Sequence, residues 1–344
     1  PDRGWDEGGV GNKGHARRRG SHTETFPGMI PVQIPHAGWL DLSQVRAGAV
    51  VAIRGFGLTC IDAILTLTEG RGGVFTPTGS HRFRYFPGPN EPDRIIPFSR
   101  SGMPPVAKPE VSYEQSHPQL AQVWCEGRQR LEQSNRPRSG LTVREDLLPV
   151  ILETASAALR SVIGSRRHLE QADEMRRLLL GPPHGDDPLG QMKCSLQIAF
   201  GEREPDEAWA LGEAWRRLYP ALVKGVSYGG LRQSAWPLFK KVAARMERLA
   251  FGPPAENLAR LVSLVDAGVV DLTWCSAPTV ETQRERARLA RGGQVAEADC
   301  LIDAVLPKPG IAPGDPTVFQ QLFRGKHVRT LRGTHGIEVT PAGE

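Results

Sequence analysis

The stretch from Ala47 to Asp62 constrains the fold of this chain more than any other. Its sequence, AGAVVAIRGFGLTCID, begins with a short apolar run rich in β-branched residues and continues into a tight Gly55-Phe56-Gly57 turn. Apolar residues at helical spacing follow directly. Strand, glycine turn and helix in this order are typical of a βαβ unit that holds a pyrophosphate at the helix N-terminus. The stretch therefore predicts an α/β protein with a Rossmann-like core.

This turn departs from the usual fingerprint at one position, where Cys60 replaces the third glycine. That position needs only a residue small enough for the helix to pack on the strand. The alternative for Gly55 and Gly57 is a turn shaped only for packing. Thr59 fits either a phosphate ligand or an ordinary first helical turn.

Composition excludes several classes of protein. The 344 residues, of which 39% are hydrophobic and 24% charged, suit a globular chain of about two domains. A net charge of +5 is too small to favour nucleic acid as a partner. No run approaches the roughly 20 apolar residues of a membrane span, so no membrane association is expected. The five scattered cysteines predict reduced thiols in a cytoplasmic protein, and the histidines lack the spacing of a metal site.

The pattern of apolar and turn residues divides the chain into four regions. Residues 1–46 are rich in glycine, proline and arginine and are expected to be irregular. Residues 47–109 form the Rossmann-like NAD(P)H-binding core, residues 110–275 a helix-rich region, and residues 276–344 a set of returning strands. Within them the pattern predicts helices near 142–162, 166–180, 206–219, 234–250 and 256–267, and strands at 269–274 and 300–305.

Two further elements are predicted inside the core. Residues 74–87 read as a β-hairpin with its turn at Thr78-Gly79-Ser80. Arg94 to Phe98 is a short apolar strand, although Pro97 argues against a central position for it because proline cannot donate to a sheet.

Ser99-Arg100-Ser101 follows this strand, at the place where an NAD-preferring site carries an acidic residue for the ribose hydroxyls. A guanidinium between two hydroxyls suits a 2′-phosphate instead, through charge-assisted hydrogen bonds. The sequence therefore predicts NADP(H) as cofactor, with Arg100 as the discriminating residue. The alternative is a surface arginine stacked on an aromatic residue of the hairpin. The candidate cofactor-binding residues are Gly55, Phe56, Gly57, Leu58, Thr59, Ser99, Arg100 and Ser101.

Several motifs taken together resemble one family of proteins. They are Gly55-Phe56-Gly57-Leu58-Thr59 with Asp62, residues 68–73 (TEGRGG), residues 99–104 (SRSGMP) and residues 299–304 (DCLIDA). This set is similar to the FAD-NAD(P)-binding family, which includes flavoproteins related to amino-acid N-hydroxylating, nitrosuccinate-forming monooxygenases. The resemblance implies an oxidoreductase in which NADPH reduces FAD and the reduced flavin activates oxygen. It also implies a small-molecule substrate such as an amino acid or amine, and it assigns no catalytic residue here.

The resemblance also implies a larger protein. Members of the family open with an FAD domain that has its own glycine fingerprint, and the NAD(P)H domain is nested inside it. This chain lacks that first fingerprint and begins at Pro1. We therefore expect a fragment whose FAD site lies largely outside this chain, and which is inactive by itself. The alternative is a non-enzymatic nucleotide-binding or scaffold module whose Rossmann core is only structural.

Overall fold

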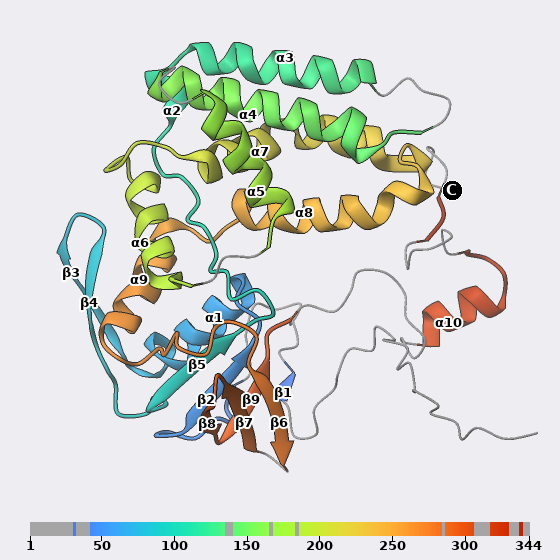
Figure 1. The fold of residues 1–344 in the computed structure, drawn as a ribbon. Helices are drawn as coiled ribbons and strands as arrows, with labels where there is room; N and C mark the ends of the chain where they lie inside the picture. Colours follow the sequence, from blue (N-terminus) through green and yellow to red (C-terminus); the bar gives the residue numbers. More distant parts are fainter. Residues whose placement is uncertain are drawn as a thin grey trace, which may run out of the picture.

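A parallel sheet lies at the base of the molecule, below a layer of long helices (Figure 1). The computed structural model describes residues 30–31, 42–134, 140–164, 168–182, 186–283, 286–305, 317–329 and 337–339. The predicted irregular region 1–46 therefore lies almost wholly outside the described residues. The sheet has the strand order β1 (Ile30–Pro31), β9 (Cys300–Asp303), β2 (Val50–Arg54) and β5 (Arg94–Phe98).

The residues of β2 alternate between two apolar layers. Val51 and Ile53 belong to the cluster formed with α1, whereas Ala52 belongs to a cluster on the opposite face. All three side chains are fully buried. Because both faces of a parallel sheet are covered, such a strand reads as a continuous apolar run. The observed α/β fold, with its parallel sheet and covering helices, is compatible with the predicted Rossmann-like core.

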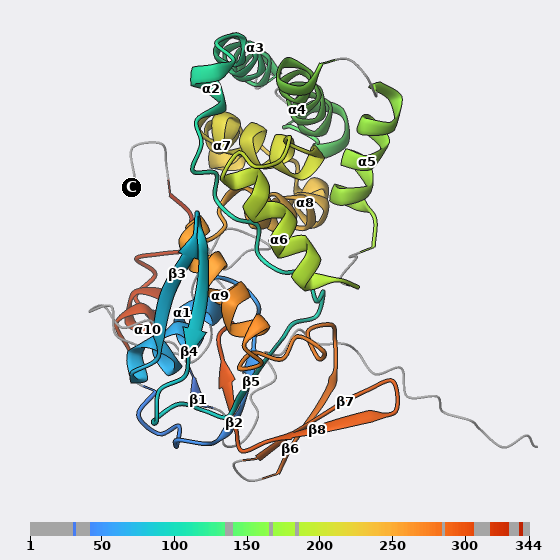
Figure 2. The same cartoon turned by 90° about the vertical axis from the view of Figure 1, so that its left-hand side faces the viewer.

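Different elements cover the two faces of the sheet. Helices α1 (Leu58–Leu67) and α9 (Ala255–Asp266) pack on one face. An antiparallel meander of β6 (Thr279–Gln283), β7 (Arg286–Arg291) and β8 (Gln294–Ala298) packs on the other, as Figure 2 shows. These three strands lie where returning strands were expected, but the sequence pattern did not resolve them individually.

The predicted hairpin is confirmed as β3 (Val74–Gly79) and β4 (Arg82–Phe86). It follows α1 through a single 3-10 turn, Glu69–Arg71. Gly72 then leaves the turn with φ of +98°, a left-handed conformation that glycine adopts at little cost. The chain thereby reverses between α1 and the hairpin.

Strand β5 is the last strand in the order of the sheet, so Pro97 does not lie in a central strand, as its missing amide hydrogen predicted. Strand β5 pairs with β2 on one side and with the segment around Val270 on the other. The Ile95 and Ser99 amides donate to Val269 and Cys275 across this second side, each at 2.8 Å. Between these two bonds the neighbouring chain forms a turn at Thr273 and Trp274, so no strand lies opposite the Pro97 nitrogen on this side. The predicted strand 269–274 is wrong for the same reason, because only Val270 forms a bridge and the following residues form a turn.

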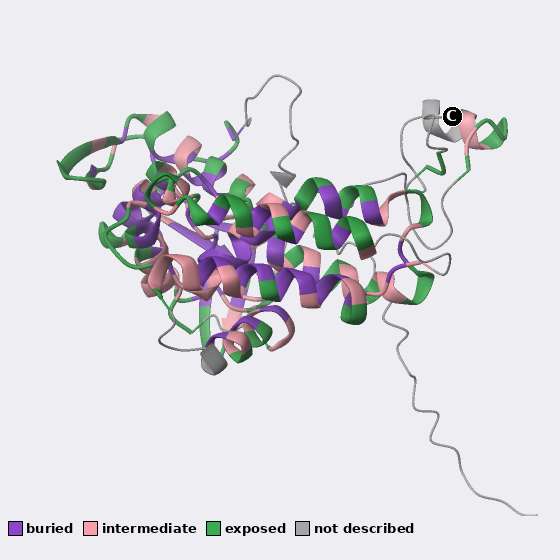
Figure 3. Cartoon of the chain, turned by 90° about the horizontal axis from the view of Figure 1, so that it is seen from above, coloured by how far each residue is buried: buried purple, intermediate pink, exposed green. Residues whose placement is uncertain are grey.

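The helical layer has its own core, in which Trp124, Ile151 and Trp215 are almost fully buried. Seen from above, the helices turn their buried residues inward and their exposed residues outward (Figure 3). Its elements are α2 (Tyr113–Ser116), α3 (Gln119–Ser134), a π-helical turn (Val143–Leu147), α4 (Leu148–Ile163), α5 (His168–Leu180), α6 (Pro188–Ala199), α7 (Glu207–Val226) and α8 (Trp236–Ala250). A separate helix, α10 (Thr317–Arg324), lies to one side in Figure 1.

The helices predicted near 142–162, 166–180, 206–219, 234–250 and 256–267 are present as α4, α5, α7, α8 and α9. Helix α7 is longer than predicted because it continues through Pro220 to Val226. Among the residues that the structure describes, none of the helices combines the length and apolar character needed to cross a membrane.

Candidate functional site

The glycine turn leaves the carboxyl end of β2 in a conformation that Gly55 makes possible. Its φ is +108°, and its amide donates to the Phe98 carbonyl at 2.8 Å. A Cβ atom at this position would lie 3.1 Å from the carbonyl carbon and oxygen of Ala304. Both the backbone conformation and the close approach of β9 therefore require glycine at position 55.

Gly57 differs, because packing within the protein does not explain it. Gly57 is exposed and has a φ of −123°. An added Cβ would meet no protein atom within 4 Å. It is the N-cap of α1, and no side chain caps the helix there. The amides of the first turn are consequently available to a ligand, and the helix dipole favours an anion at this end.

The other residues of the turn have distinct environments. Phe56 is buried with 7% exposure and anchors the turn in the core, whereas Leu58 is 47% exposed. Thr59 is half-buried, and its hydroxyl forms no hydrogen bond with any other described residue. Cys60 is completely buried among the residues between α1 and the sheet, and burial raises the pKa of its thiol. A small side chain at this position therefore packs where the third glycine would lie.

Ser99, Arg100 and Ser101 form the next turn, at the carboxyl end of β5. The Ser99 hydroxyl accepts from the Gly102 amide at 3.1 Å, and the Ser101 hydroxyl accepts from the Met103 amide at 3.4 Å. Each hydroxyl keeps its hydrogen for a further acceptor. Arg100 is exposed and has no hydrogen bond or ion pair with any residue described here.

The structure places a different arginine against the hairpin aromatics. The guanidinium carbon of Arg260 lies 5.5 Å from the ring centre of Phe75 and 5.8 Å from that of Phe83. The alternative in which Arg100 stacks on these rings is therefore not observed.

The two turns lie at the same edge of the sheet. Strands β2 and β5 are parallel and directly paired, with Arg54 opposite Phe98, so Gly55 and Ser99 both follow the carboxyl ends of neighbouring strands. Ligands of open α/β sheets bind at this edge. Arg71 lies at the other end of α1, about 15 Å away along the helix. Its guanidinium donates to the carbonyls of Leu42 and Val45 at 2.7 and 2.8 Å, which is a structural role.

An ion pair that the sequence did not reveal borders this edge. Arg54 Nη1 lies 3.4 Å from Asp303 Oδ2, and the two residues are paired in register at the ends of β2 and β9. Asp303 also accepts from the Val305 amide at 3.2 Å. Asp303 is therefore a hydrogen-bonded carboxylate that links two strands of the sheet. Its partner was unpredictable because Arg54 is 249 residues distant in sequence.

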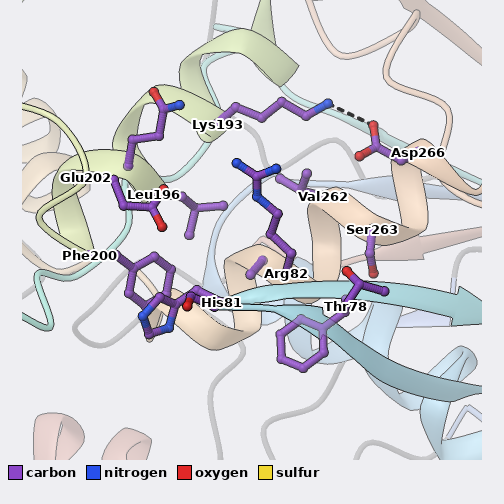
Figure 4. A pocket seen from close by; sticks show the side chains of 14 residues that line it. Thr78, His81, Arg82, Lys193, Leu196, Phe200, Glu202, Val262, Ser263 and Asp266 are labelled. Carbon is purple, nitrogen blue, oxygen red and sulfur yellow. Dashed lines mark hydrogen bonds and ion pairs between the residues drawn. The ribbon is translucent and has the colours of Figure 1, made fainter.

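A cavity of about 320 Å³ lies between the hairpin, α6 and α9 (Figure 4). Its wall includes His81, whose ring stacks on Phe200 with 3.7 Å between ring centres. The Lys193 ammonium pairs with Asp266 at 2.9 Å across the opposite side, and the Arg82 guanidinium points into the space between them. The His81–Phe200 stack holds the hairpin tip, where His81 has a φ of +60°, against the helical layer.

Neither metal ligands nor disulfides define a site in the part of the chain that the structure describes. No group of three or more histidine, cysteine, aspartate or glutamate residues within it is arranged to hold a metal ion. All five cysteines are free.

No protein-family model matches this chain. It is 25% identical over 362 residues to a protein of Streptomyces cremeus named L-aspartate N-monooxygenase (nitrosuccinate-forming), covering 88% of this chain and 54% of the relative. The protein of the same name from Streptomyces davaonensis is 24% identical, and nitrosuccinic acid synthase npaA of Aspergillus oryzae is 23% identical, with similar coverage. This chain is thus a distant relative of these monooxygenases and spans about half of their length.

Proposed function

We propose that this chain is the NADPH-binding part of a flavin-dependent oxidoreductase of the monooxygenase type. The observation that supports this most directly is the pairing of two turns at one edge of a parallel sheet. One turn presents an uncapped helix N-terminus behind an exposed glycine, and the other presents an arginine without a partner among the described residues. The distant monooxygenase relatives add support for the reaction type.

The residues of these turns suit the parts of NADPH. The amides of Gly57, Leu58 and Thr59 would hold the pyrophosphate, because Gly57 leaves room for the backbone to approach it. Arg100 would bind the 2′-phosphate through its guanidinium, with the Ser99 and Ser101 hydroxyls donating beside it. Phe56, buried beneath the turn, would fix its position.

The remaining chemistry comes from groups outside this set. When bound, NADPH supplies a hydride, and a flavin in the same protein would accept it and react with oxygen. We assign no described residue to FAD, whose site we place largely in the part of the protein beyond this chain. By analogy with the names of the relatives, the substrate is a small amino acid or amine.

Titration with NADPH and NADH tests the cofactor assignment. Wild-type protein should bind NADPH more tightly, and Arg100→Ala should weaken NADPH binding by roughly 10- to 100-fold while changing NADH binding little, because it removes a charge-assisted contact. Arg46→Ala, an exposed arginine before β2 at the opposite edge, is the matched control and should change neither. An equal loss of both cofactors in Arg100→Ala would contradict the assignment.

A spectroscopic experiment separates this proposal from a scaffold role. The full-length protein should purify with a flavin spectrum that bleaches when NADPH is added under anaerobic conditions. If a flavin is present but NADPH leaves its spectrum unchanged, the sheet is a structural module and the oxidoreductase assignment fails.

A further inference from the structure

A partly open cavity of about 490 Å³ lies in the helical layer, away from the glycine turn. Helices α5, α6, α7 and α8 contribute its walls, together with the segment that follows β5. Much of the lining is apolar, from Met103, Leu178, Ile198, Trp209 and Leu249. This volume lies within the range of about 300–1,000 Å³ that is typical of small-molecule sites.

Three arginines line this cavity, and Arg216 pairs with Glu213, whereas the two arginines of α8 have only carbonyl partners among the described residues. Arg245 donates to the carbonyls of Leu178 and Gly181 at 3.1 and 2.6 Å, and Arg248 donates to the Pro104 carbonyl at 3.0 Å. Neither arginine forms an ion pair with another described residue. Carbonyl oxygens accept hydrogen bonds from a guanidinium but do not neutralise its positive charge. Such a charge is costly to bury without a counter-ion.

Burial leaves Arg248 with a donor that no described residue satisfies and with a lowered pKa. Its Nε atom is buried without a hydrogen-bond partner among the described residues. Burial, followed by repulsion from Arg245, lowers the pKa of its guanidinium to about 10. A bound anion would satisfy the free donor and offset the charge of both guanidiniums at once.

The carboxylates around the cavity are mostly engaged elsewhere. Asp187 caps α6 by accepting from the Gly190 amide at 2.8 Å, and Asp206 caps α7 by accepting from the Trp209 amide at 2.9 Å. A third carboxylate, Glu174, pairs with Arg177 at 2.7 Å. The fourth, Glu207, lies in the first turn of α7, where the helix dipole favours its negative charge. None of the four pairs with Arg245 or Arg248.

We propose that this cavity binds a small organic carboxylate with an apolar body. The carboxylate would lie against Arg245 and Arg248, and the apolar body against Leu178, Ile198 and Trp209. The indole nitrogen of Trp209, a residue of the lining, is a buried donor without a partner among the described residues. This site does not depend on dinucleotide binding.

Isothermal titration calorimetry on the 344-residue chain tests this proposal with three probes. The first is 4-phenylbutyrate, the second is its neutral amide, 4-phenylbutanamide, and the third is L-aspartate, which lacks an apolar body. The acid should bind at least about ten-fold more tightly than the amide, because only the acid supplies the counter-charge. It should also bind more tightly than L-aspartate. Equal binding of acid and amide, or preferential binding of L-aspartate, would overturn the proposal.

Two variants locate the binding site. Arg248→Gln and Arg245→Gln should each weaken 4-phenylbutyrate binding by about ten-fold and leave amide binding nearly unchanged. Arg82→Gln, in the cavity beside the hairpin, is the matched control and should bind the acid like wild type. Circular dichroism establishes that each variant is folded. If both α8 variants are folded and still bind the acid normally, the proposal fails, and if neither folds, the comparison of probes on wild-type protein decides alone.

Discussion

Arg54 and Asp303 form an ion pair with 3.4 Å between Nη1 and Oδ2, and they join strands from opposite ends of the chain. Their side chains are only 23% and 13% exposed, so water weakens this pair less than it would at an open surface. The pair therefore stabilises the edge at which the glycine turn begins.

A double-mutant cycle with Arg54→Met and Asp303→Asn measures this coupling. We expect a coupling free energy of roughly 1 kcal/mol in urea unfolding, because the pair is partly buried. The cycle is needed because Arg54 and Asp303 each have further interactions, which the single variants would also remove. Additive effects of the two substitutions would show that the pair does not contribute.

The two glycines of the turn should respond differently to alanine. Gly55→Ala should destabilise the protein by roughly 1–3 kcal/mol, because a φ of +108° and the contact with Ala304 both oppose a side chain. Gly57→Ala should cost less than about 1 kcal/mol in stability, since its Cβ meets no protein atom.

NADPH binding, unlike stability, should be sensitive to a side chain at Gly57. If Gly57 leaves room for a pyrophosphate, then Gly57→Ala weakens NADPH binding although the protein remains stable. Thermal unfolding and NADPH titration of the same samples distinguish the two effects. Normal NADPH affinity in Gly57→Ala would remove this glycine from the proposed site.

Asp206 should make the stability of the helical layer depend on pH. Burial raises the pKa of its carboxyl above the usual value, and hydrogen bonds from backbone amides only partly oppose this. The folded state then binds the proton more tightly than the unfolded state. This contribution to stability is present in full below the unfolded pKa and is lost as pH rises through the raised folded pKa.

The variant Asp206→Asn isolates this effect, because asparagine caps a helix about as well as aspartate but does not titrate. In urea unfolding across the acidic range, the free energy of unfolding of wild type should fall relative to that of Asp206→Asn as pH rises through the raised pKa. Asp206→Ala also loses the cap of α7 and should cost about 1 kcal/mol at neutral pH. Identical pH profiles for wild type and Asp206→Asn would refute the assignment.

The contact between α7 and α8 should not tolerate a side chain at Gly212. An added Cβ would lie 2.6 Å from the carbonyl oxygen of Leu249, a backbone atom that cannot move without shifting α8. Gly212→Ala should therefore destabilise the protein by roughly 1–3 kcal/mol, despite the greater helix propensity of alanine. The matched control is Gly70→Ala, where the nearest atom is 3.7 Å away. Chemical unfolding of both variants measures the difference, and equal stabilities would contradict this account.

The sequence predicted elements whose signal is local. The apolar run of β2, the turn at Gly55 and the spacing of α1 are contiguous, so they could be recognised without knowledge of the tertiary structure. The position of Arg100 after β5 could also be predicted, because the ends of successive parallel strands meet at one edge of a sheet, whereas its role stays a prediction. Helices α7 and α8 were predicted from their periodic apolar residues.

Other features depended on contacts between distant segments. The strands of the meander are short and polar, with only one face buried, as in β7 where Ala287 and Leu289 are buried between exposed arginines. Pro97 indicated correctly that β5 is not a central strand, but the turn of the neighbouring chain beside it is not encoded locally. The pairing of Arg245 and Arg248 with an apolar cavity likewise appears only when four helices pack together.

The position of β9 between β1 and β2 has a consequence for how this protein is made. One backbone edge of β2 is paired only when residues 300–302 of β9 have been synthesised, about 250 residues after β2. Until then β2 is paired only with β5, and its other backbone edge is a template for aggregation. Completion of the sheet is therefore a late step with a large loop-closure cost. A chain that ends before Cys300 should be captured by chaperones or precipitate, even though its helical layer is complete.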